Sequence, residues 1–433
     1  MTVSDDRQFS SRTAAKNPAI ARHGRLKPHS AWRTVAKVTA TVVAIALASS
    51  TAVVAYAAWD LASTVQPTVK LESEKVLEGV PDIGAIDGGV NFLLIGSDSR
   101  EGQGGGYGDP DEETAVLNDV TMLLHIAQDH SHAEVVSFPR DMFVSVPECT
   151  DPEDPTGDTL SALSSVKINS VLAYGGMDCV VKTVSELTGV VIPFAGIVQF
   201  NGVAALSEAV GGVEVCIAEP IQDEHTDLDL PAGMQSLSGL TALQFLRTRH
   251  GVGDGSDLGR ISNQQVFLSA LVRTLQSSGT LSDPVKLFGI AKAALANMTL
   301  SDALTDPAKM ISIAKALKDI DLSQIAFMQY PTGSTEGGLL PSDSAEVVNL
   351  ALQNDVPVSF DPNAGDTSFA SVADPNAAAP APVEEAPTEG TDAAPTDDAA
   401  AVPAATTEAL PSDVSGQTAA ETRCSSGRPL EDQ

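Results

Sequence analysis

The run NFLLIGSD, residues 91–98, is an apolar stretch that ends abruptly in a polar turn. Two more runs share this form, VTMLLHIA at 120–127 and AEVVSFP at 133–139, and GGVEVCIAEP at 211–220 is a fourth apolar run. Short apolar runs bounded by turn residues are typical of strands buried in a sheet. We therefore predict a strand at each of these positions.

Segments with helical periodicity lie between and after these strands. They are residues 170–189, 200–212, 236–250, 261–276, 283–298 and 306–320. The first two run into glycine, which is a common helix stop. Strands interleaved with helices over residues 80–360 predict one α/β domain whose sheet is covered by helices.

The N-terminal part of the chain joins a basic segment to an apolar one. Residues 1–37 hold eight Lys and Arg against two Asp, and residues 38–59 carry no charge. These 22 residues are long enough to cross a membrane core of roughly 30 Å. We expect a single-pass membrane anchor with a cytoplasmic N-terminus, a linker at 60–87 and an extracytoplasmic domain. A cleaved signal peptide is the alternative, since Ala55-Tyr56-Ala57 fits a cleavage pattern.

The composition changes after residue 360. Residues 361–433 carry nine prolines, abundant alanine, fourteen acidic residues and only two arginines. Such a segment offers too little apolar surface to offset the entropy of ordering it. We predict that residues 361–433 form a disordered tail.

The four cysteines would lie in a compartment that permits disulfides. They form no CxxC pair, so a zinc site is poorly supported. Cys149 and Cys179 flank a polar excursion rich in proline and glycine, and we predict a disulfide between them. Cys216 lies in an apolar run, so a core thiol is its simplest interpretation, and the pairing of Cys216 and Cys424 is left open.

Arginines are few in the central part of the chain and share one kind of position. Residues 60–360 contain 41 acidic residues and six arginines, although the whole chain has a formal charge of −32. Five of the six lie after a predicted strand or beside a turn: Arg100, Arg140, Arg247, Arg249 and Arg260. Strand ends are where open α/β sheets place ligands, and the guanidinium fork suits phosphate. Structural ion pairs with nearby carboxylates are the alternative.

Carboxylates accompany these arginines. Asp98, Asp119, Asp141 and Asp257 lie beside the same turns. Mg²⁺ is commonly held by one or two carboxylates together with phosphate oxygens, so the set suits a pyrophosphate bridged by a metal. Each aspartate is equally suited to capping a turn or a helix. Gln264 follows Arg260 by four residues and shares its helix face near a helix N-terminus that favours anions.

Several other functions find no support in the sequence. GxxxxGK[ST] and GxSxG are absent, and the seven histidines form no metal-binding pattern. Basic patches studded with aromatic residues are missing outside the N-terminal part, which argues against nucleic-acid binding.

Six blocks of sequence, taken together and in order, resemble the LytR–CpsA–Psr family of bacterial cell-wall ligases over residues 88–335. The blocks are NFLLIGSDSR, NDVTMLLHI with VVSFPRDMFV, KINSVLAYGG, QFNGVAALSEAVGGVEVCI, LPAGMQSLSGLTALQFLRTRH and SDLGRISNQQ. The resemblance implies a catalytic domain at 88–335, with the end of the globular part at 336–360. It also implies a central mixed β-sheet covered by helices on both sides.

The resemblance further implies an enzyme. Such an enzyme transfers a glycopolymer from a polyprenyl-pyrophosphate carrier to a peptidoglycan hydroxyl and leaves a phosphodiester link. The matched positions imply that Asp98 and Asp119 hold Mg²⁺ or Mn²⁺. Pyrophosphate would be bound by Arg100, Arg140, Arg247, Arg249, Arg260 and Gln264. Asp141 and Asp257 would orient arginines, and Asp119 or Asp141 would serve as general base.

The chain departs from the family pattern at two positions, and two alternative functions are compatible with the same residues. The family often has a basic residue where this chain has Asn118 and Asn263, and we expect both changes to weaken the positive field of the site. A non-catalytic module that binds the lipid carrier would need the arginines but not the aspartates. A polyprenyl-pyrophosphate pyrophosphatase would use water in place of the sugar hydroxyl.

Overall fold

The computed structural model describes residues 31–80, 86, 89–103, 116–154, 157, 159–277, 279–361, 370–372 and 407–433. The basic residues 1–30, part of the expected linker and residues 373–406 of the expected tail lie outside these ranges. The chain divides into two units, Met1–Asp60 and Leu61–Gln433.

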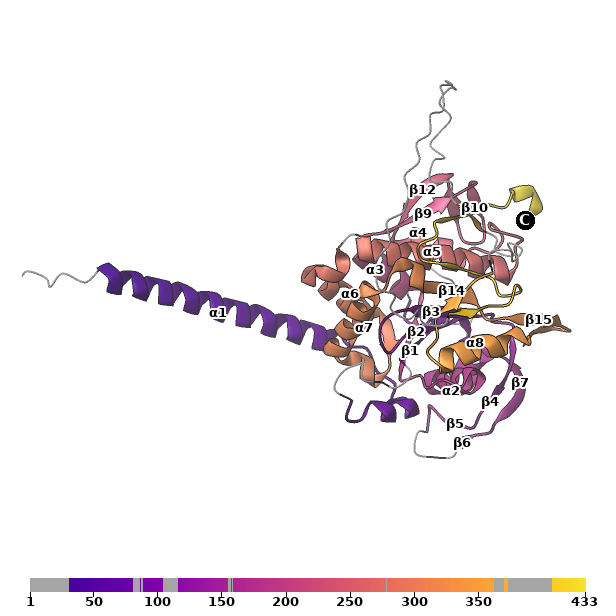
Figure 1. Cartoon of the computed structure of the whole chain (residues 1–433), viewed down its shortest axis with the longest axis horizontal. Helices are drawn as coiled ribbons and strands as arrows, with labels where there is room; N and C mark the ends of the chain where they lie inside the picture. Colours follow the sequence, from indigo (N-terminus) through magenta and orange to yellow (C-terminus); the bar gives the residue numbers. More distant parts are fainter. Residues whose placement is uncertain are drawn as a thin grey trace, which may run out of the picture. The chain divides into compact units, whose positions relative to one another are not determined.

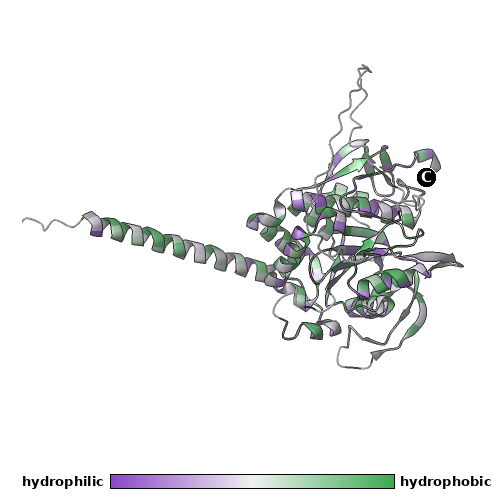
Figure 2. Ribbon diagram, viewed as in Figure 1, coloured by the Kyte–Doolittle hydropathy of each residue, from purple (hydrophilic) through white to green (hydrophobic). Residues whose placement is uncertain are grey.

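The first unit holds most of the long helix α1 (Ala31–Thr64). Its stretch Trp32–Leu61 is apolar and long enough to cross a membrane, and apolar residues follow one another along it in Figure 2. The predicted apolar span at 38–59 therefore lies within one continuous helix.

The second unit is built around a seven-stranded mixed sheet (Figure 1). Its strand order is β13-β8-β1-β2-β3-β14-β20. The strands are β1 (Val90–Ser97), β2 (Asn118–Ile126), β3 (Ala133–Phe138), β8 (Phe194–Val198), β13 (Met298–Leu300), β14 (Ile325–Gln329) and β20 (Gly416–Thr418). The antiparallel trio β1–β2–β3 is flanked by parallel neighbours, β8 beside β1 and β14 beside β3.

Helices cover both faces of this sheet, as expected. Leu93 and Ile95 of β1 pack in a core formed with α2 (Val171–Thr188) and α8 (Ser344–Gln353). Phe92 and Leu94, which point to the other face, pack in a second core. That core includes residues of α3 (Phe200–Val210), α5 (Asp257–Ser277), α6 (Pro284–Asn297) and α7 (Pro307–Asp319). The alternation follows from the two-residue period of a strand.

Smaller sheets and hairpins surround this centre. Four strands form a second sheet, in the order β12 (Gly233–Leu237), β9 (Val213–Ile217), β21 (Arg423–Ser425) and β18 (Ala370–Val372). Helix α4 (Gly239–Arg247) and α5 share its core. The two-stranded pairs are β4 (Phe143–Val146) with β7 (Leu163–Lys167), β5 (Cys149–Thr150) with β6 (Thr159–Leu160), β10 (Ile221–Asp223) with β11 (Leu228–Leu230), β15 (Thr332–Thr335) with β16 (Gly338–Pro341), and β17 (Val358–Ser359) with β19 (Glu408–Ala409).

The prediction that residues 361–433 form a disordered tail is wrong for the C-terminal part. Strand β20 pairs with β14 and completes one edge of the central sheet, and Ala419 is fully buried beside it. Arg273 of α5 donates to the carbonyls of Ala419 and Glu421, both at 2.9 Å. Composition averaged over the whole segment misses these residues, because an added edge strand is stabilised mainly by backbone hydrogen bonds.

Two disulfides are present. Cys149 and Cys179 are bonded, as predicted. The interpretation of Cys216 as a core thiol is wrong, since Cys216 of β9 is bonded to Cys424 of β21, 208 residues further along. Parallel pairing of β9 with β21 sets these two residues directly opposite each other.

A cluster of buried polar groups lies at the end of the sheet where β2 leaves and β3 begins. His125 faces Asn91 Oδ1 at 2.9 Å and Asp355 Oδ1 at 3.0 Å. His132 Nδ1 lies 2.9 Å from Glu134 Oε1, and both residues are buried. Burial lowers the pKa of His132, but Glu134 and Asp355 outweigh it and raise the pKa overall.

This pKa shift predicts a pH-dependent stability. The folded state binds the His132 proton more tightly than the unfolded state, so the contribution is complete below about pH 6.5 and is lost as the pH rises through the folded pKa. Thermal unfolding of the full chain in detergent should show a midpoint that falls more steeply between pH 6.5 and 8.5 in the wild type than in His132→Gln. Equal slopes in the two proteins would contradict the assignment.

Candidate active site

Strand register brings the first group of site residues to one edge of the central sheet. Ser97 at the end of β1 lies opposite Asn118 at the start of β2, and Thr121 lies opposite Phe138 at the end of β3. Asp98, Asp119 and Arg140 are the neighbours of these ends, so antiparallel pairing gathers them although up to 42 residues separate them. The parallel strand β8 ends at the same edge.

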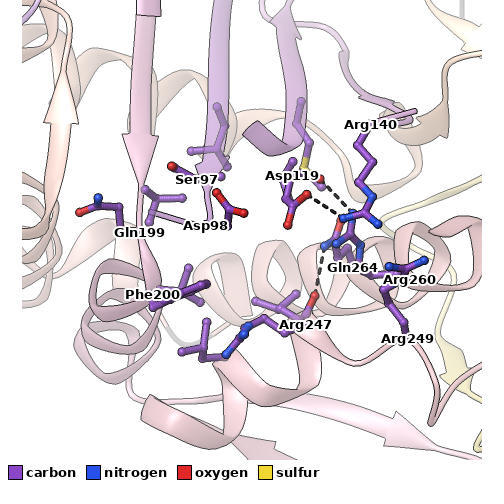
Figure 3. A pocket seen from close by; sticks show the side chains of 18 of the residues that line it. Ser97, Asp98, Asp119, Arg140, Gln199, Phe200, Arg247, Arg249, Arg260 and Gln264 are labelled. Carbon is purple, nitrogen blue, oxygen red and sulfur yellow. Dashed lines mark hydrogen bonds and ion pairs between the residues drawn. The ribbon is translucent and has the colours of Figure 1, made fainter. Parts of the chain in front are cut away.

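The second group comes from the arginine segment, which we define as residues 247–260. It begins at the last residue of α4, runs through a glycine-rich loop and ends in the first turn of α5. Arg247, Arg249 and Arg260 all line the same cavity as Asp98 and Asp119 (Figure 3). Arg100, Arg140 and Gln264 line it as well, so eight of the ten predicted site residues share this cavity.

The cavity has a volume of about 310 Å³ and two kinds of wall. One kind is made of the charged residues just named, and the rest of the lining is largely apolar. The apolar side chains are Leu94, Val120, Met122, Val198, Phe200, Val203, Leu243, Leu246 and Leu268. A space lined by both arginines and apolar side chains suits an amphipathic anion.

Arg140 is surrounded by three carboxylates. Its Nη1 lies 2.8 Å from Asp119 Oδ1, and its Nε lies 3.5 Å from Asp257 Oδ1 and 3.6 Å from Asp141 Oδ2. Burial lowers the pKa of Arg140, but these carboxylates outweigh it and raise the pKa overall. Arg140 is therefore held as a fixed positive charge.

Arg260 is the most deeply buried of the cations in the cavity lining, with 6% of its surface exposed. Its Nη2 lies 2.6 Å from Asp257 Oδ1 and donates to the backbone carbonyl of Asp119 at 2.9 Å. Burial is the main cause that lowers the pKa of Arg260, and the charge of Asp257 opposes it. Asp257 does not line the cavity; it pairs with Arg140 and Arg260, as expected of a residue that orients arginines.

Several guanidinium nitrogens are buried without a hydrogen bond. Among the described residues, Nε of Arg249 and of Arg260 has no hydrogen-bond acceptor, and Nε of Arg140 has only the two carboxylate oxygens at 3.5 and 3.6 Å, too distant for a hydrogen bond. A buried donor without an acceptor costs free energy, so an oxygen supplied by a ligand would stabilise these groups. The N-terminus of α5 offers fewer free amides to an anion than expected, because Ser256 Oγ already accepts from the amides of Leu258 and Gly259.

The two predicted metal ligands face a common space. Asp98 Oδ1 accepts from the Leu117 amide at 2.8 Å. Burial is the main cause that raises the pKa of Asp98. The hydrogen bond from the Leu117 amide lowers this pKa, whereas the nearby charge of Asp119 raises it further. A cation would offset this concentration of negative charge, and two carboxylates with phosphate oxygens form a suitable donor set for Mg²⁺. Within the described ranges, no three His, Cys, Asp or Glu side chains form a complete metal site.

Asp141 does not line the cavity. Its Oδ1 accepts from Lys167 Nζ at 2.7 Å. Burial is the largest single effect and raises the pKa of Asp141, but the Lys167 hydrogen bond and the charges of Lys167 and Arg140 together lower the pKa overall. The structure thus supports contact with Arg140 but gives no support for contact between Asp141 and a substrate. Lys167 was missed from the sequence, although it opens the KINS motif at the end of β7.

Gln199 and Phe200 are two further lining residues that sequence reasoning missed. They follow β8 directly, and the centre of the Phe200 ring lies 4.3 Å from the guanidinium carbon of Arg247. Such a cation–π contact orients a guanidinium without neutralising it. The QFNG motif that begins at Gln199 directly follows strand β8, so it could have indicated these residues. The sequence analysis did not predict that strand and therefore missed them.

The expected effect of Asn118 and Asn263 on the positive field is not supported. Asn118 is fully buried, accepts from the Leu172 amide and donates to Thr121 Oγ1. Asn263 is buried too, donates to the Phe245 carbonyl at 2.6 Å and accepts from Ser425 Oγ. Neither side chain lines the cavity, so both serve packing between elements.

The chain is thus an α/β protein with a cavity at one sheet edge that combines arginines, two aspartates and apolar side chains. The chain belongs to the LytR_cpsA_psr family, whose model matches residues 54–349.

Relatives in two bacterial groups agree with this family. The cell wall biosynthesis protein LcpA of Corynebacterium glutamicum is 31% identical over 253 residues, which cover 52% of this chain and 47% of that protein. The probable cell wall biosynthesis protein LcpB of the same organism is 34% identical over 222 residues, 49% of each chain. The polyisoprenyl-teichoic acid–peptidoglycan teichoic acid transferase TagT of Bacillus subtilis is 25% identical over 277 residues, 62% of this chain and 77% of that protein. The chain thus spans about half the length of the two Corynebacterium relatives.

Removal of the Asp257 carboxylate should cost stability. Asp257→Asn leaves Arg140 and Arg260 with less compensating charge, so the free energy of unfolding should fall by about 1–3 kcal/mol. Chemical unfolding of the full chain measures this change, and Asp319→Asn, which alters an exposed residue at the end of α7, is the matched control. A loss no larger than that of the control would show that the pairs contribute nothing.

Proposed function

We propose that this protein transfers a glycopolymer from a polyprenyl-pyrophosphate carrier to a hydroxyl of peptidoglycan and forms a phosphodiester link. Membership of the family supports this function, as do relatives that are named as transferases between a polyisoprenyl-linked polymer and peptidoglycan. The observation that carries it is the convergence of arginines, two aspartates and many apolar side chains on one cavity.

The cavity matches the two parts of such a carrier. A pyrophosphate placed among Arg140, Arg249 and Arg260 would meet buried donors that lack acceptors. The polyprenyl chain would then lie against the apolar wall formed by α3, α4 and the sheet. Burial of apolar surface contributes roughly 25 cal/mol per Å², which favours a long hydrocarbon in this space.

A divalent cation, Mg²⁺ or Mn²⁺, is part of the proposal. Asp98 and Asp119 would hold it, and when bound it would neutralise charge on the phosphate oxygens. The arginines would bind the remaining oxygens, fix the orientation of the phosphates and stabilise the charge that develops on the departing carrier phosphate. Of the two carboxylates considered as general base, only Asp119 lines the cavity, where it also pairs with Arg140.

The membrane topology is also proposed. Helix α1 would anchor the chain with its N-terminus in the cytoplasm, because the basic residues precede the apolar span. The domain would then face the cell wall. Two disulfides in the second unit are in keeping with an extracytoplasmic location.

An acceptor assay tests the proposal. The full chain in detergent, supplied with a lipid-linked saccharide, Mg²⁺ and peptidoglycan fragments, should release polyprenyl monophosphate and yield a saccharide–peptidoglycan phosphodiester detectable by mass spectrometry. Asp98→Ala and Arg140→Ala should each lower the rate by roughly 10²–10³-fold, and EDTA should abolish it. Lys315→Ala on the exposed face of α7 is the control.

The alternatives give different products in the same assay. Release of monophosphate without any link to peptidoglycan would favour a pyrophosphatase. Lipid that binds without turnover would favour a carrier-binding module. Turnover that survives both EDTA and Asp98→Ala would remove the metal from the proposal.

The apolar wall can be tested separately from the charged end. Val203 of α3 lines the cavity, and Val203→Phe would fill part of it. The KM for the lipid-linked substrate should rise about tenfold because the hydrocarbon loses space, whereas affinity for inorganic pyrophosphate should not change. An equal loss of both would show that the substitution disturbs the arginines instead.

A further inference from the structure

The arginine segment cannot hold its own shape. Between α4 and α5 it contains Gly251, Gly253 and Gly255, and the last two have φ angles of 57° and 80°. Such left-handed backbone favours glycine, and glycine loses more conformational freedom on ordering than any other residue. Contacts from other parts of the chain must therefore fix the position of Arg249 in the loop, and Arg260 follows the loop in the first turn of α5.

One side of the segment is held by the β10–β11 hairpin. Asp223 is 2% exposed, and its Oδ2 accepts from Thr248 Oγ1 at 2.5 Å and from the Arg249 amide at 3.3 Å. Burial raises the pKa of Asp223, but the Thr248 bond and nearby amides outweigh it and lower the pKa overall. Asp223 is thus a buried carboxylate that anchors the start of the loop.

The opposite side is held by the clamp segment, which we define as residues 423–433. Gly427 forms an antiparallel bridge with Val252, and the Arg428 amide donates to the Gly251 carbonyl at 2.9 Å. The Gly253 amide donates to the Ser426 carbonyl at 3.4 Å.

Two further contacts fasten the clamp segment itself. Ser425 Oγ donates to Asn263 Oδ1 in α5, one residue before the lining residue Gln264. The Cys216–Cys424 disulfide and the amide of Ala218, which donates to Ser425 at 2.9 Å, tie the segment to β9. All of it lies beyond residue 349, where the match to the family model ends.

We propose that the clamp segment, fastened by Cys216–Cys424, is a positioning element that holds Arg249 and Arg260 in place for the pyrophosphate. The inference rests on the proposed function for the identity of the anion. Because no residue of the clamp segment lines the cavity, its effect acts indirectly, through the arginine segment and through Asn263 of α5. Preorganised arginines bind an anion without the cost of ordering the loop, so loss of the clamp should weaken binding.

The two disulfides provide a matched comparison. Cys216→Ser with Cys424→Ser should raise the Kd of the full chain for inorganic pyrophosphate about tenfold and raise the KM for the lipid-linked substrate, with kcat nearly unchanged. Hydrogen exchange of the amides at 248–256 should become faster. Cys149→Ser with Cys179→Ser removes a disulfide outside the cavity lining and should leave both the Kd and the exchange at 248–256 unchanged.

A second pair of variants keeps both disulfides. Arg428→Pro removes the amide that donates to Gly251, whereas Arg428→Ala retains it. The proline variant should reproduce the faster exchange at 248–256 and the weaker binding, and the alanine variant should show a smaller change in each. Equal effects of proline and alanine would overturn the role of this backbone bond.

The outcomes separate the inference from the proposed function. If the wild type binds pyrophosphate and the cysteine and proline variants bind it equally well, the clamp is not a positioning element. If those variants loosen residues 248–256 but the wild type binds no pyrophosphate, the clamp orders the loop while the assigned anion is wrong, and the positioning role for pyrophosphate falls with it.

Discussion

The antiparallel register of β1, β2 and β3 is the constraint on which the site depends. It brings the chain back to the same edge of the sheet, so that Asp98, Asp119 and Arg140 lie near one another because of strand pairing. The strands themselves are fixed by apolar residues buried on both faces, and a slip of one residue would turn every side chain to the wrong core. The geometry of the charged groups is thus set by hydrophobic packing at a distance from them.

Charge compensation is the second constraint. Buried guanidinium groups are expensive to desolvate, and the protein keeps them by pairing Arg140 and Arg260 with the same carboxylate, that of Asp257. The pairing is incomplete, since within the described residues the Nε atoms of Arg249 and Arg260 have no hydrogen-bond acceptor, and that of Arg140 lies 3.5 Å or more from the nearest carboxylate oxygens. An acidic chain thereby presents a local positive site whose excess charge is directed into one cavity.

The sequence allowed prediction of the α/β class, the three strands of the antiparallel trio and the six helices between residues 170 and 320, because their apolar periodicity is strong. It did not reveal β8 or β14, whose runs are short and adjoin segments with stronger signals. The candidate site was largely predictable from rare arginines beside turns. Lys167 and Phe200 were not, since their roles depend on partners far along the chain.

The C-terminal residues show the main limit of composition. A segment poor in apolar residues can still be ordered when it can pair with an open sheet edge and form a disulfide with a distant cysteine. The local sequence of residues 407–433 does not indicate that such an edge exists. Pairing information of this kind is held by the partner strands β14 and β9 rather than by the added strand.

The connectivity of the disulfides bears on how the chain matures. The four cysteines pair in the order in which they are synthesised, the first with the second and the third with the fourth, out of three possible arrangements. An oxidant that acts on thiols as they emerge would therefore produce the native bonds directly, without an isomerase to correct them. The second bond closes a covalent ring of the residues from 216 to 424, so the arginine segment becomes enclosed only when that bond forms.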